Sequence, residues 1–318
     1  MLGAGSSMRP YDPDDARHAL RHSRPLRSCP PTAMNDPHDV LPPTGGLRAV
    51  LDHLPVDTAE AALGVVVASA GSTYRKPGAL LLFDGGTRTG WLSGGCLEAE
   101  LEAAAREVLA TRRARLAVFD TRDEADLWFG SASGCRGEVR VLLLPISGAA
   151  PLVNALGALA AGRAALDLVL HGDGSGRASL GGCAWHWPAS APGEAGGPCW
   201  RLRLAPPPRV LLLGAGPESA PLCAFLRRLG WFVDAVEHRG RWTTALTAAD
   251  RHLSAPPQRA WDDLDPIRYA AALVMGHHFA NDLEHLRRLA GCAIPYVGLL
   301  GPTARRDALL AGLGTPEA

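Results

Sequence analysis

The stretch Arg209–Leu222, with the sequence RVLLLGAGPESAPL, decides the fold of the C-terminal part of this chain. An apolar run ends at Gly214, and a helical pattern follows it. A strand, a glycine turn and a helix in this order open a Rossmann-type unit, because glycine lets a phosphate approach the backbone amides at the helix N-terminus. Gly214 and Gly216 occupy the expected positions, and Ser219 stands where a third glycine is usual.

Two interpretations of this loop remain open. In the first, Gly214–Ser219 binds a phosphate group, and Glu237 at the end of the next apolar run contacts a sugar hydroxyl. In the second, the domain has the Rossmann shape and binds no nucleotide. Pro217 removes one donor amide, although proline is tolerated at the first position of a helix.

The residues after this loop continue the alternation of strands and helices. Strands are expected at Phe232–Val236, Ala272–Met275 and Ile294–Val297, with helices near Leu283–Ala290 and from about Thr303 to Leu313. Such alternation predicts a parallel sheet with helices on both faces. We therefore expect a Rossmann-like domain over residues 206–318, which begins with the stiff linker Pro206–Pro208.

Residues 45–205 predict a separate α/β domain. Its expected strands are Leu63–Ala68, Ala79–Phe83, Gly90–Leu92, Leu116–Phe119 and Val139–Leu144, and its expected helices are Leu47–Leu54 and Leu97–Thr111. The stretch 148–205 is treated as a continuation of this domain, with a helix at Pro151–Ala161, an extended segment at Leu166–Leu170, and antiparallel strands at Cys183–Trp187 and Trp200–Leu204. The fold class is therefore α/β in both halves.

Residues 1–44 predict a disordered extension. They contain eight prolines and no apolar periodicity, so they cannot bury enough surface to offset the entropy of ordering. Met34 is an alternative start of the protein, because the foldable sequence begins only about ten residues later.

Composition excludes several classes of function. Lys+Arg and Asp+Glu are 32 each, and this balance argues against a general nucleic-acid binder. No apolar run is long enough to span a membrane, and no signal peptide is visible. Seven cysteines, an odd number in a chain of this length, indicate reduced thiols rather than a disulfide scaffold. We therefore expect a cytoplasmic protein without a membrane or nucleic-acid partner.

Glycine-rich segments of the N-terminal domain contain the residues that are candidates for binding a ligand. Arg75 and Lys76 lie in the loop of GSTYRKPGALLLF, where two cations suit an anionic ligand, although an ordinary hairpin with solvated charges has the same pattern. Cys96 follows the turn Ser93–Gly95 at the start of a helix, a place that favours a thiolate. The alternative is a small buried cysteine, with Glu98 completing a cap.

Three further groups are candidates for ligand binding. Cys135 lies in the loop GSASGCRG, where flexible backbone lets a thiol approach a ligand, and it is hypothesised to face the same pocket as Cys96. His277, His278 and Asp282 follow an expected strand of the Rossmann-like domain, at the edge where ligands bind; a helix cap by Asn281 or Asp282 with surface histidines is the alternative. The helix at Thr303 offers Arg305 and Arg306 near its N-terminus.

These motifs together resemble the xanthine dehydrogenase accessory protein family of the XdhC/CoxI type. The matching segments are Gly71–Ala79, Leu92–Glu98, Gly134–Val139, Val210–Gly216 and Tyr296–Gly301, in the order of the family. The resemblance implies a chaperone that binds the sulfurated molybdenum cofactor (molybdopterin) as cargo and delivers it to an apo molybdenum hydroxylase. It also implies a cysteine desulfurase as the supplier of sulfur, and it leaves a homodimer open.

The resemblance suggests which residues hold the cofactor. Soft thiolates suit molybdenum, so Cys96 and Cys135 are the expected metal ligands. The other expected cofactor-binding residues are Arg75, Lys76, Gly214, Gly216, Ser219, Glu237, His277 and Asp282. No catalytic residue is expected.

Two other classes of function stay open. An NAD(P)-dependent oxidoreductase fits the Rossmann-like part, but Lys76 is the only lysine, so the chain lacks a Tyr-x-x-x-Lys proton donor. A pure protein-interaction module would leave the cysteine loops unexplained.

Overall fold

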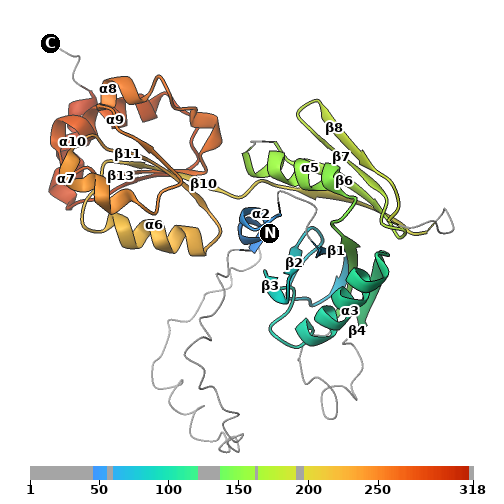
Figure 1. The fold of residues 1–318 in the computed structure, drawn as a ribbon. Helices are drawn as coiled ribbons and strands as arrows, with labels where there is room; N and C mark the ends of the chain where they lie inside the picture. Colours follow the sequence, from blue (N-terminus) through green and yellow to red (C-terminus); the bar gives the residue numbers. More distant parts are fainter. Residues whose placement is uncertain (1–45, 56–59, 121–136, 162–163, 191–196, 315–318) are drawn as a thin grey trace, which may run out of the picture. The chain divides into compact units, whose positions relative to one another are not determined.

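The computed structural model describes residues 46–55, 60–120, 137–161, 164–190 and 197–314 (Figure 1). The expected disordered extension and the loop with Cys135 lie outside these residues. In the described part, three sheets of five, four and five strands form, and helices pack against them. Both halves of the chain are therefore mixed α/β, as the sequence predicts.

The first sheet is antiparallel and has the strand order β3-β2-β1-β5-β4. Its strands are β1 (Ala61–Gly71), β2 (Leu80–Asp84), β3 (Thr87–Thr89), β4 (Arg115–Asp120) and β5 (Gly137–Pro145). The central pair is β1 and β5, and its register shifts between Val66 and Ala68. Such a bulge increases the local twist of the pair, close to the loops that follow β1 and precede β5.

Alternate side chains of β1 point to opposite faces of this sheet, and both faces are covered. On one face Ala62 and Val66 pack with helix α3 (Glu98–Thr111). On the other face Leu63 and Val65 belong to a second core, to which α2 (Gly46–Asp52) and α5 (Ala150–Ala161) contribute. This double burial explains why β1 is an almost continuous apolar run rather than an alternating one.

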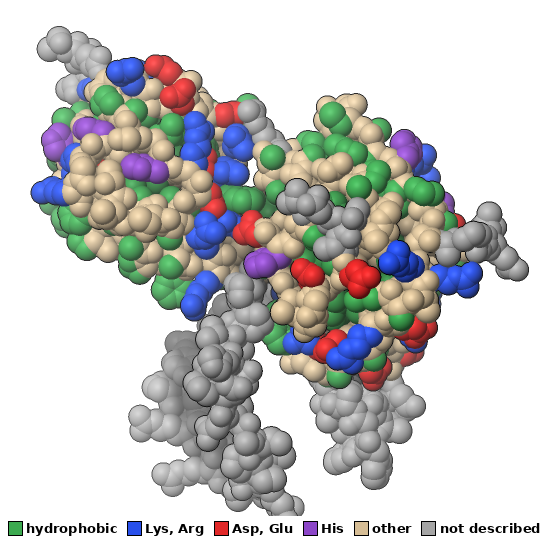
Figure 2. Space-filling model, in the orientation of Figure 1, with side chains coloured by type: hydrophobic (Ala, Val, Ile, Leu, Met, Phe, Trp, Pro, Cys, Tyr) green, Lys and Arg blue, Asp and Glu red, His purple; other side chains and the backbone are tan. Residues whose placement is uncertain are grey.

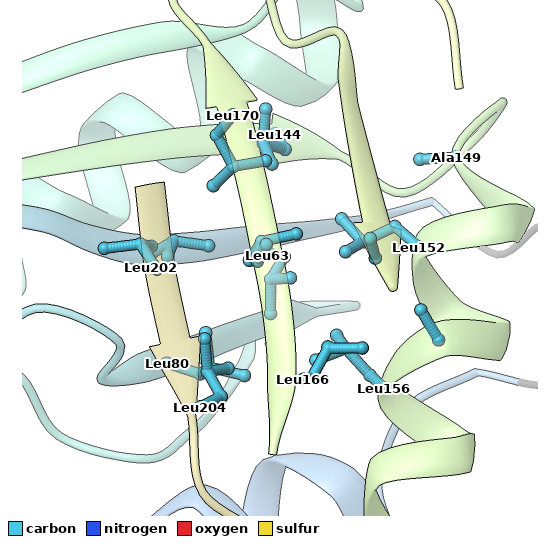
Figure 3. Close-up of a cluster of buried hydrophobic side chains, with 14 of the residues drawn as sticks. Leu63, Leu80, Leu144, Ala149, Leu152, Leu156, Leu166, Leu170, Leu202 and Leu204 are labelled. Carbon is cyan, nitrogen blue, oxygen red and sulfur yellow. The ribbon is translucent and has the colours of Figure 1, made fainter. Parts of the chain in front are cut away.

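The second sheet has the strand order β8-β7-β6-β9 and is also antiparallel. Its strands are β6 (Leu166–His171), β7 (Gly176–Leu180), β8 (Cys183–Trp187) and β9 (Cys199–Leu204). Figure 3 shows Leu166 and Leu204 of this sheet in one cluster with Leu63 of β1 and Leu156 of α5. One hydrophobic core therefore joins the two antiparallel sheets.

The third sheet is parallel throughout, with the order β12-β11-β10-β13-β14. Its strands are β10 (Arg209–Leu213), β11 (Phe232–Val236), β12 (Arg251–Leu253), β13 (Ala271–Val274) and β14 (Val297–Leu299). Its helices are α6 (Ser219–Arg228), α7 (Gly240–Thr243), α8 (Pro257–Ala260), α9 (Phe279–Ala290) and α10 (Thr303–Leu313), with short 3-10 turns at Thr244–Leu246 and Pro266–Arg268. Val210 and Leu212 pack on the face of α6, and Leu211 and Leu213 pack on the opposite face, so the predicted Rossmann-like arrangement is confirmed.

Some expected strands are displaced or were missed. The third strand is Thr87–Thr89 and not Gly90–Leu92, because Gly90 has a φ of +97° and turns the chain against Leu80. The last strand starts at Val297 rather than at Ile294, since Pro295 cannot donate to a sheet ladder. Strands β7 and β12 were not predicted, because GRASL and RHL contain few apolar residues.

The shared core predicts a large effect of truncating Leu63, which is 1% exposed. We expect Leu63→Ala to lower the free energy of unfolding by about 2–5 kcal/mol, since the cavity cannot close between two packed sheets. The matched control is Val118→Ala on β4, where the side chain is 52% exposed and the expected loss is below about 0.5 kcal/mol. Urea unfolding of both variants measures the difference, and equal losses would contradict this description of the core.

Candidate functional site

Three glycine-rich segments of the N-terminal domain meet in one small pocket. Its lining comes from the loop after β1, from the turn before α3 and from the start of β5, and includes Ser72, Thr73, Tyr74, Ser93, Gly94, Cys96, Gly137 and Val139. These segments are far apart in the sequence, and each carries a separate glycine-rich motif. The structure therefore brings three of the predicted motifs to one place.

The turn before α3 is held by a buried carboxylate. Ser93 Oγ accepts hydrogen bonds from the amides of Gly95 (3.0 Å) and Leu97 (3.1 Å), and it donates to the Glu98 side chain. The other Glu98 oxygen accepts from the Ser93 amide at 3.0 Å, and Glu98 is only 3% exposed. Glu98 thus binds Ser93 and closes the turn, which is one of the two alternatives that the sequence left open for it. These hydrogen bonds fix the backbone on both sides of Cys96.

The Cys96 thiol is free, half-buried and part of the pocket lining. It lies two residues before α3 and packs against the apolar cluster under that helix. Cys135 lies outside the described residues, so the expectation that both thiols face one pocket stays a prediction. The chain re-enters the described part at Gly137, where an added Cβ would meet the Ser72 oxygen at 2.4 Å. Glycine is required there for β5 to start against the loop after β1.

The two predicted cations lie beside this pocket and do not line it. Arg75 Nε donates to the carbonyl oxygen of Trp91 at 3.1 Å, which ties the loop after β1 to the residues just before the Cys96 turn. Lys76 Nζ donates to Thr73 Oγ1 at 3.1 Å and is exposed. Their role in binding an anion stays a prediction.

A second cluster of predicted residues lies at the carboxyl edge of the parallel sheet. Gly214 has a φ of +89°, and a Cβ placed on it would lie 2.2 Å from the Cα atom of Gly276. The ends of β10 and β13 thus approach so closely that only glycine fits. This is the point at which the strand order reverses, where ligands of such sheets bind.

The Glu237 carboxylate at this edge already has hydrogen-bond donors within the chain. Its carboxylate accepts from the Ala215 amide at 2.9 Å and from Arg239, through the backbone amide at 2.8 Å and the guanidinium at 2.6 Å. Burial alone would raise the pKa of the Glu237 carboxyl, but the hydrogen bonds from Arg239 and Ala215 outweigh it and hold the pKa below its ordinary value. A ribose hydroxyl would have to compete with these partners.

The amides of the glycine-rich loop have internal acceptors as well. The Gly216 amide donates to Ser219 Oγ at 2.9 Å, and the Ala215 amide donates to Glu237. The Glu218 carboxylate lies next to Gly216 and binds His277 Nε2 at 2.9 Å. A phosphate at Gly214–Ser219 would have to displace these acceptors, so this site stays a prediction.

Asp282 is fully buried and forms a second ion pair at this edge. Arg305 Nη2 of α10 lies 2.5 Å from Asp282 Oδ2, and Oδ1 has no hydrogen-bond partner among the described residues. Burial raises the pKa of Asp282, and the guanidinium of Arg305 opposes that effect.

Helix α9 is capped by His278, which accepts from the Asn281 amide, rather than by Asn281 or Asp282. Arg306 pairs with its neighbour Asp307.

His285 is the side chain at this edge whose pKa is shifted most from its ordinary value. It is 2% exposed, and its Nδ1 accepts from Trp261 Nε1 at 3.1 Å. Burial lowers the pKa of His285 to about 4, although the nearby charge of Glu237 acts in the other direction. The ring is therefore neutral at pH 7, with its proton on Nε2.

A small pocket at the carboxyl edge of the parallel sheet is lined by only some of the predicted residues. Gly214, Glu237 and Asp282 line it, whereas Gly216, Ser219 and His277 lie outside its lining. The sequence interpretation missed Arg239 and His285, which line it too. His285 follows Asp282 by three residues on α9, so helical spacing offered a signal for it. Arg239 follows Glu237 by two residues after the end of β11, where no spacing rule applies.

Within the described residues, no three His, Cys, Asp or Glu side chains are arranged to hold a metal ion. In the same part of the chain no helix is both long and apolar enough to cross a membrane.

This combination of an antiparallel α/β domain with a cysteine turn and a Rossmann-type domain defines a known class of protein. The model of the XdhC and CoxI family matches residues 57–120, and the model of the XdhC Rossmann domain matches residues 210–318. The chain belongs to the XdhC and CoxI family.

Two similar proteins cover most of the chain. A protein of Bacillus subtilis (strain 168), named as a probable xanthine dehydrogenase subunit, is 28% identical over 293 residues, which cover 86% of this chain and 89% of that protein. A crystal structure from Bacillus halodurans, described as a xanthine dehydrogenase, is 27% identical with a TM-score of 0.69, and the match covers 83% of this chain and 84% of that one.

Because Gly214 lies against Gly276, we expect a methyl group added at Gly214 to destabilise the protein strongly. Gly214→Ala should lower the free energy of unfolding by about 3 kcal/mol or more, because the backbone has a positive φ and the added Cβ has no room. Gly240→Ala is the matched control, since no atom lies within 4 Å of its Cβ position. A stable Gly214→Ala protein, by urea unfolding, would show that the two strand ends can separate.

The buried His285 predicts a loss of stability in weak acid. The unfolded chain protonates this histidine below about pH 6.5, while the folded chain resists protonation until about pH 4. Stability therefore falls as the pH falls from 6.5 to 4, by about 3 kcal/mol at most from this group. His285→Gln, which keeps an acceptor for Trp261, should lose this part of the pH dependence. The control His186→Gln, at an exposed site, should keep it; equal curves for His285→Gln and wild type would refute the assignment.

Proposed function

We propose that this protein is an accessory chaperone that binds the sulfurated molybdenum cofactor and delivers it to an apo molybdenum hydroxylase of the xanthine dehydrogenase type. The observation that carries the proposal is the pocket at Cys96, where three glycine-rich motifs of the chain converge. The names of the similar proteins from the two Bacillus species support a xanthine dehydrogenase as the recipient. The proposal includes a cytoplasmic location and a cysteine desulfurase as the source of the cofactor's sulfur.

The residues at the pocket match the chemistry of this cargo. Molybdenum in the sulfurated cofactor is a soft centre, and a thiolate such as that of Cys96 is a soft ligand. The phosphate of molybdopterin needs cations, and Arg75 and Lys76 lie on the loop whose neighbouring residues line the pocket. The fixed turn at Ser93–Glu98 would keep the thiol in place without a change of backbone on binding.

The Rossmann-type domain gives less support to an NAD(P)-dependent oxidoreductase. The amides of Ala215 and Gly216 and the carboxylate of Glu237 already have internal partners. Hydride transfer also needs a group that exchanges a proton with the substrate, and His277 at this edge is bound to Glu218. We therefore propose a carrier rather than a catalyst.

Replacement of Cys96 tests the proposal. Cys96→Ser keeps the size of the side chain but exchanges a soft ligand for a hard one. After anaerobic purification from cells that make molybdenum cofactor, we expect wild type to carry molybdenum and pterin, and Cys96→Ser to carry at least tenfold less. The matched control is Cys183→Ser on β8, where the thiol is exposed and no role is assigned.

Two outcomes would contradict the proposal. Equal amounts of molybdenum in wild type and in Cys96→Ser would exclude the thiol as a ligand, provided that circular dichroism shows both to be folded. Absence of molybdenum and pterin from the wild-type protein would exclude the cargo itself. A loss in the Cys183→Ser control equal to that in Cys96→Ser would show that cysteine replacement acts through the fold.

A further inference from the structure

The four-stranded sheet β6–β9 has one face in the core and one face in solvent. Leu166, Leu168 and Leu170 of β6 point into the core, so the alternate residues point outward. Val169 of β6 is paired with Arg177 of β7 on one side and with Arg201 of β9 on the other. Arg177 is in turn paired with His186 of β8, so one row of the outer face runs from His186 through Arg177 and Val169 to Arg201. We call this row, which carries two arginines, the cationic row.

These two arginines differ from the others in this half of the chain. Each of the other described arginines in residues 46–204 has a hydrogen bond, an ion pair or a ring contact, whereas Arg177 and Arg201 have none with any residue that the structure describes. Both are exposed. In Figure 2, blue (Lys or Arg) and purple (His) side chains lie at the upper right of the surface, in the region where Figure 1 places these strands.

The neighbouring row on the same face shows how a sheet normally balances such charges. Arg203 of β9 is paired with Asp167 of β6, and their side chains form an ion pair of 3.2 Å. In the cationic row, Arg177 and Arg201 lie on either side of Val169, and no described acid stands in the row beside either of them. A ligand of opposite charge would supply the acid that Asp167 supplies to Arg203.

The cationic row lies in a shallow hollow, whose lining also includes Ser175, His171 and Cys199. Its shape and exposure favour a protein partner over a small anion, since an isolated anion on exposed arginines is strongly screened by salt. A protein surface excludes water over a wide area, and its carboxylates can accept two hydrogen bonds from each guanidinium.

The position of this sheet in the sequence also points to a partner-specific role. The two family models match residues 57–120 and 210–318, and neither reaches strands β6–β9. The cationic face thus belongs to the part of the chain that lies between the features shared by the family.

We infer that the outer face of β6–β9 docks an acidic protein surface, and that this surface belongs to the recipient hydroxylase. The inference rests on the proposed function for the identity of the partner, and on the unpaired Arg177 and Arg201 for its chemistry. Complementary charge acts mainly on the rate of association and on its dependence on salt. The docking face is separate from the residues proposed to hold the cargo.

The test uses the full-length double variant Arg177→Glu/Arg201→Glu. Its matched control is Arg228→Glu/Arg259→Glu, which makes the same change of charge at two other exposed arginines whose side chains contact no partner within the described ranges. Association with an immobilised apo xanthine dehydrogenase is measured at 50 and 300 mM salt. We expect the double variant to associate at least tenfold more slowly at low salt and to lose most of the salt dependence, while the control stays within about twofold of wild type.

Molybdenum retention, measured on the same preparations, separates this inference from the proposed function. Retained molybdenum with slowed association supports the inference, and wild-type association by the double variant overturns it. If wild type neither carries molybdenum nor binds the hydroxylase, the proposed function fails, and binding of a fluorescent 20-residue polyglutamate decides the docking face alone. Binding of polyglutamate that depends on Arg177 and Arg201 supports an acidic partner. Binding of inorganic pyrophosphate alone, or of neither probe, overturns it.

Discussion

The buried carboxylate of Glu98 is the constraint on which the proposed cargo site depends. Its two oxygens are held by the amide and the hydroxyl of Ser93, and the same hydroxyl accepts from the amides on either side of Cys96. Because these groups are buried, breaking the set would leave a carboxylate without partners. The turn therefore presents the thiol rigidly, at the point where α3 meets the first sheet.

The candidate ligand groups of the two domains differ in whether another side chain of the chain already pairs with them. In the N-terminal pocket the Cys96 thiol forms no disulfide and lines a small space between the loop after β1, the turn before α3 and the start of β5. At the edge of the parallel sheet, the acids expected to meet a ligand are held by arginines instead, Glu237 by Arg239 and Asp282 by Arg305. Both carboxylates of the Rossmann-type domain are thus paired with arginines where related folds bind a nucleotide.

Much of the fold could be predicted because strong local patterns coincide with the elements that bury most surface. The strand β1 and the helix α3 lie almost where the sequence placed them, and Gly214 lies at the predicted turn. The convergence of the loop after β1, the turn before α3 and the start of β5 on Cys96 could not be predicted, since it depends on the pairing of β1 with β5. The internal partners of Glu237 were missed for a similar reason, because strand-end geometry and not spacing brings the Ala215 amide to it.

The central claim is that the chain hands its cargo to another protein. The most direct measurement is transfer: the anaerobically purified, cofactor-loaded protein is mixed with apo xanthine dehydrogenase, and both hydroxylase activity and bound molybdenum are followed. The account predicts that the loaded protein activates the apo enzyme faster than free molybdenum cofactor at the same concentration, with molybdenum leaving one protein as it appears in the other. Activation no faster than with free cofactor would contradict it.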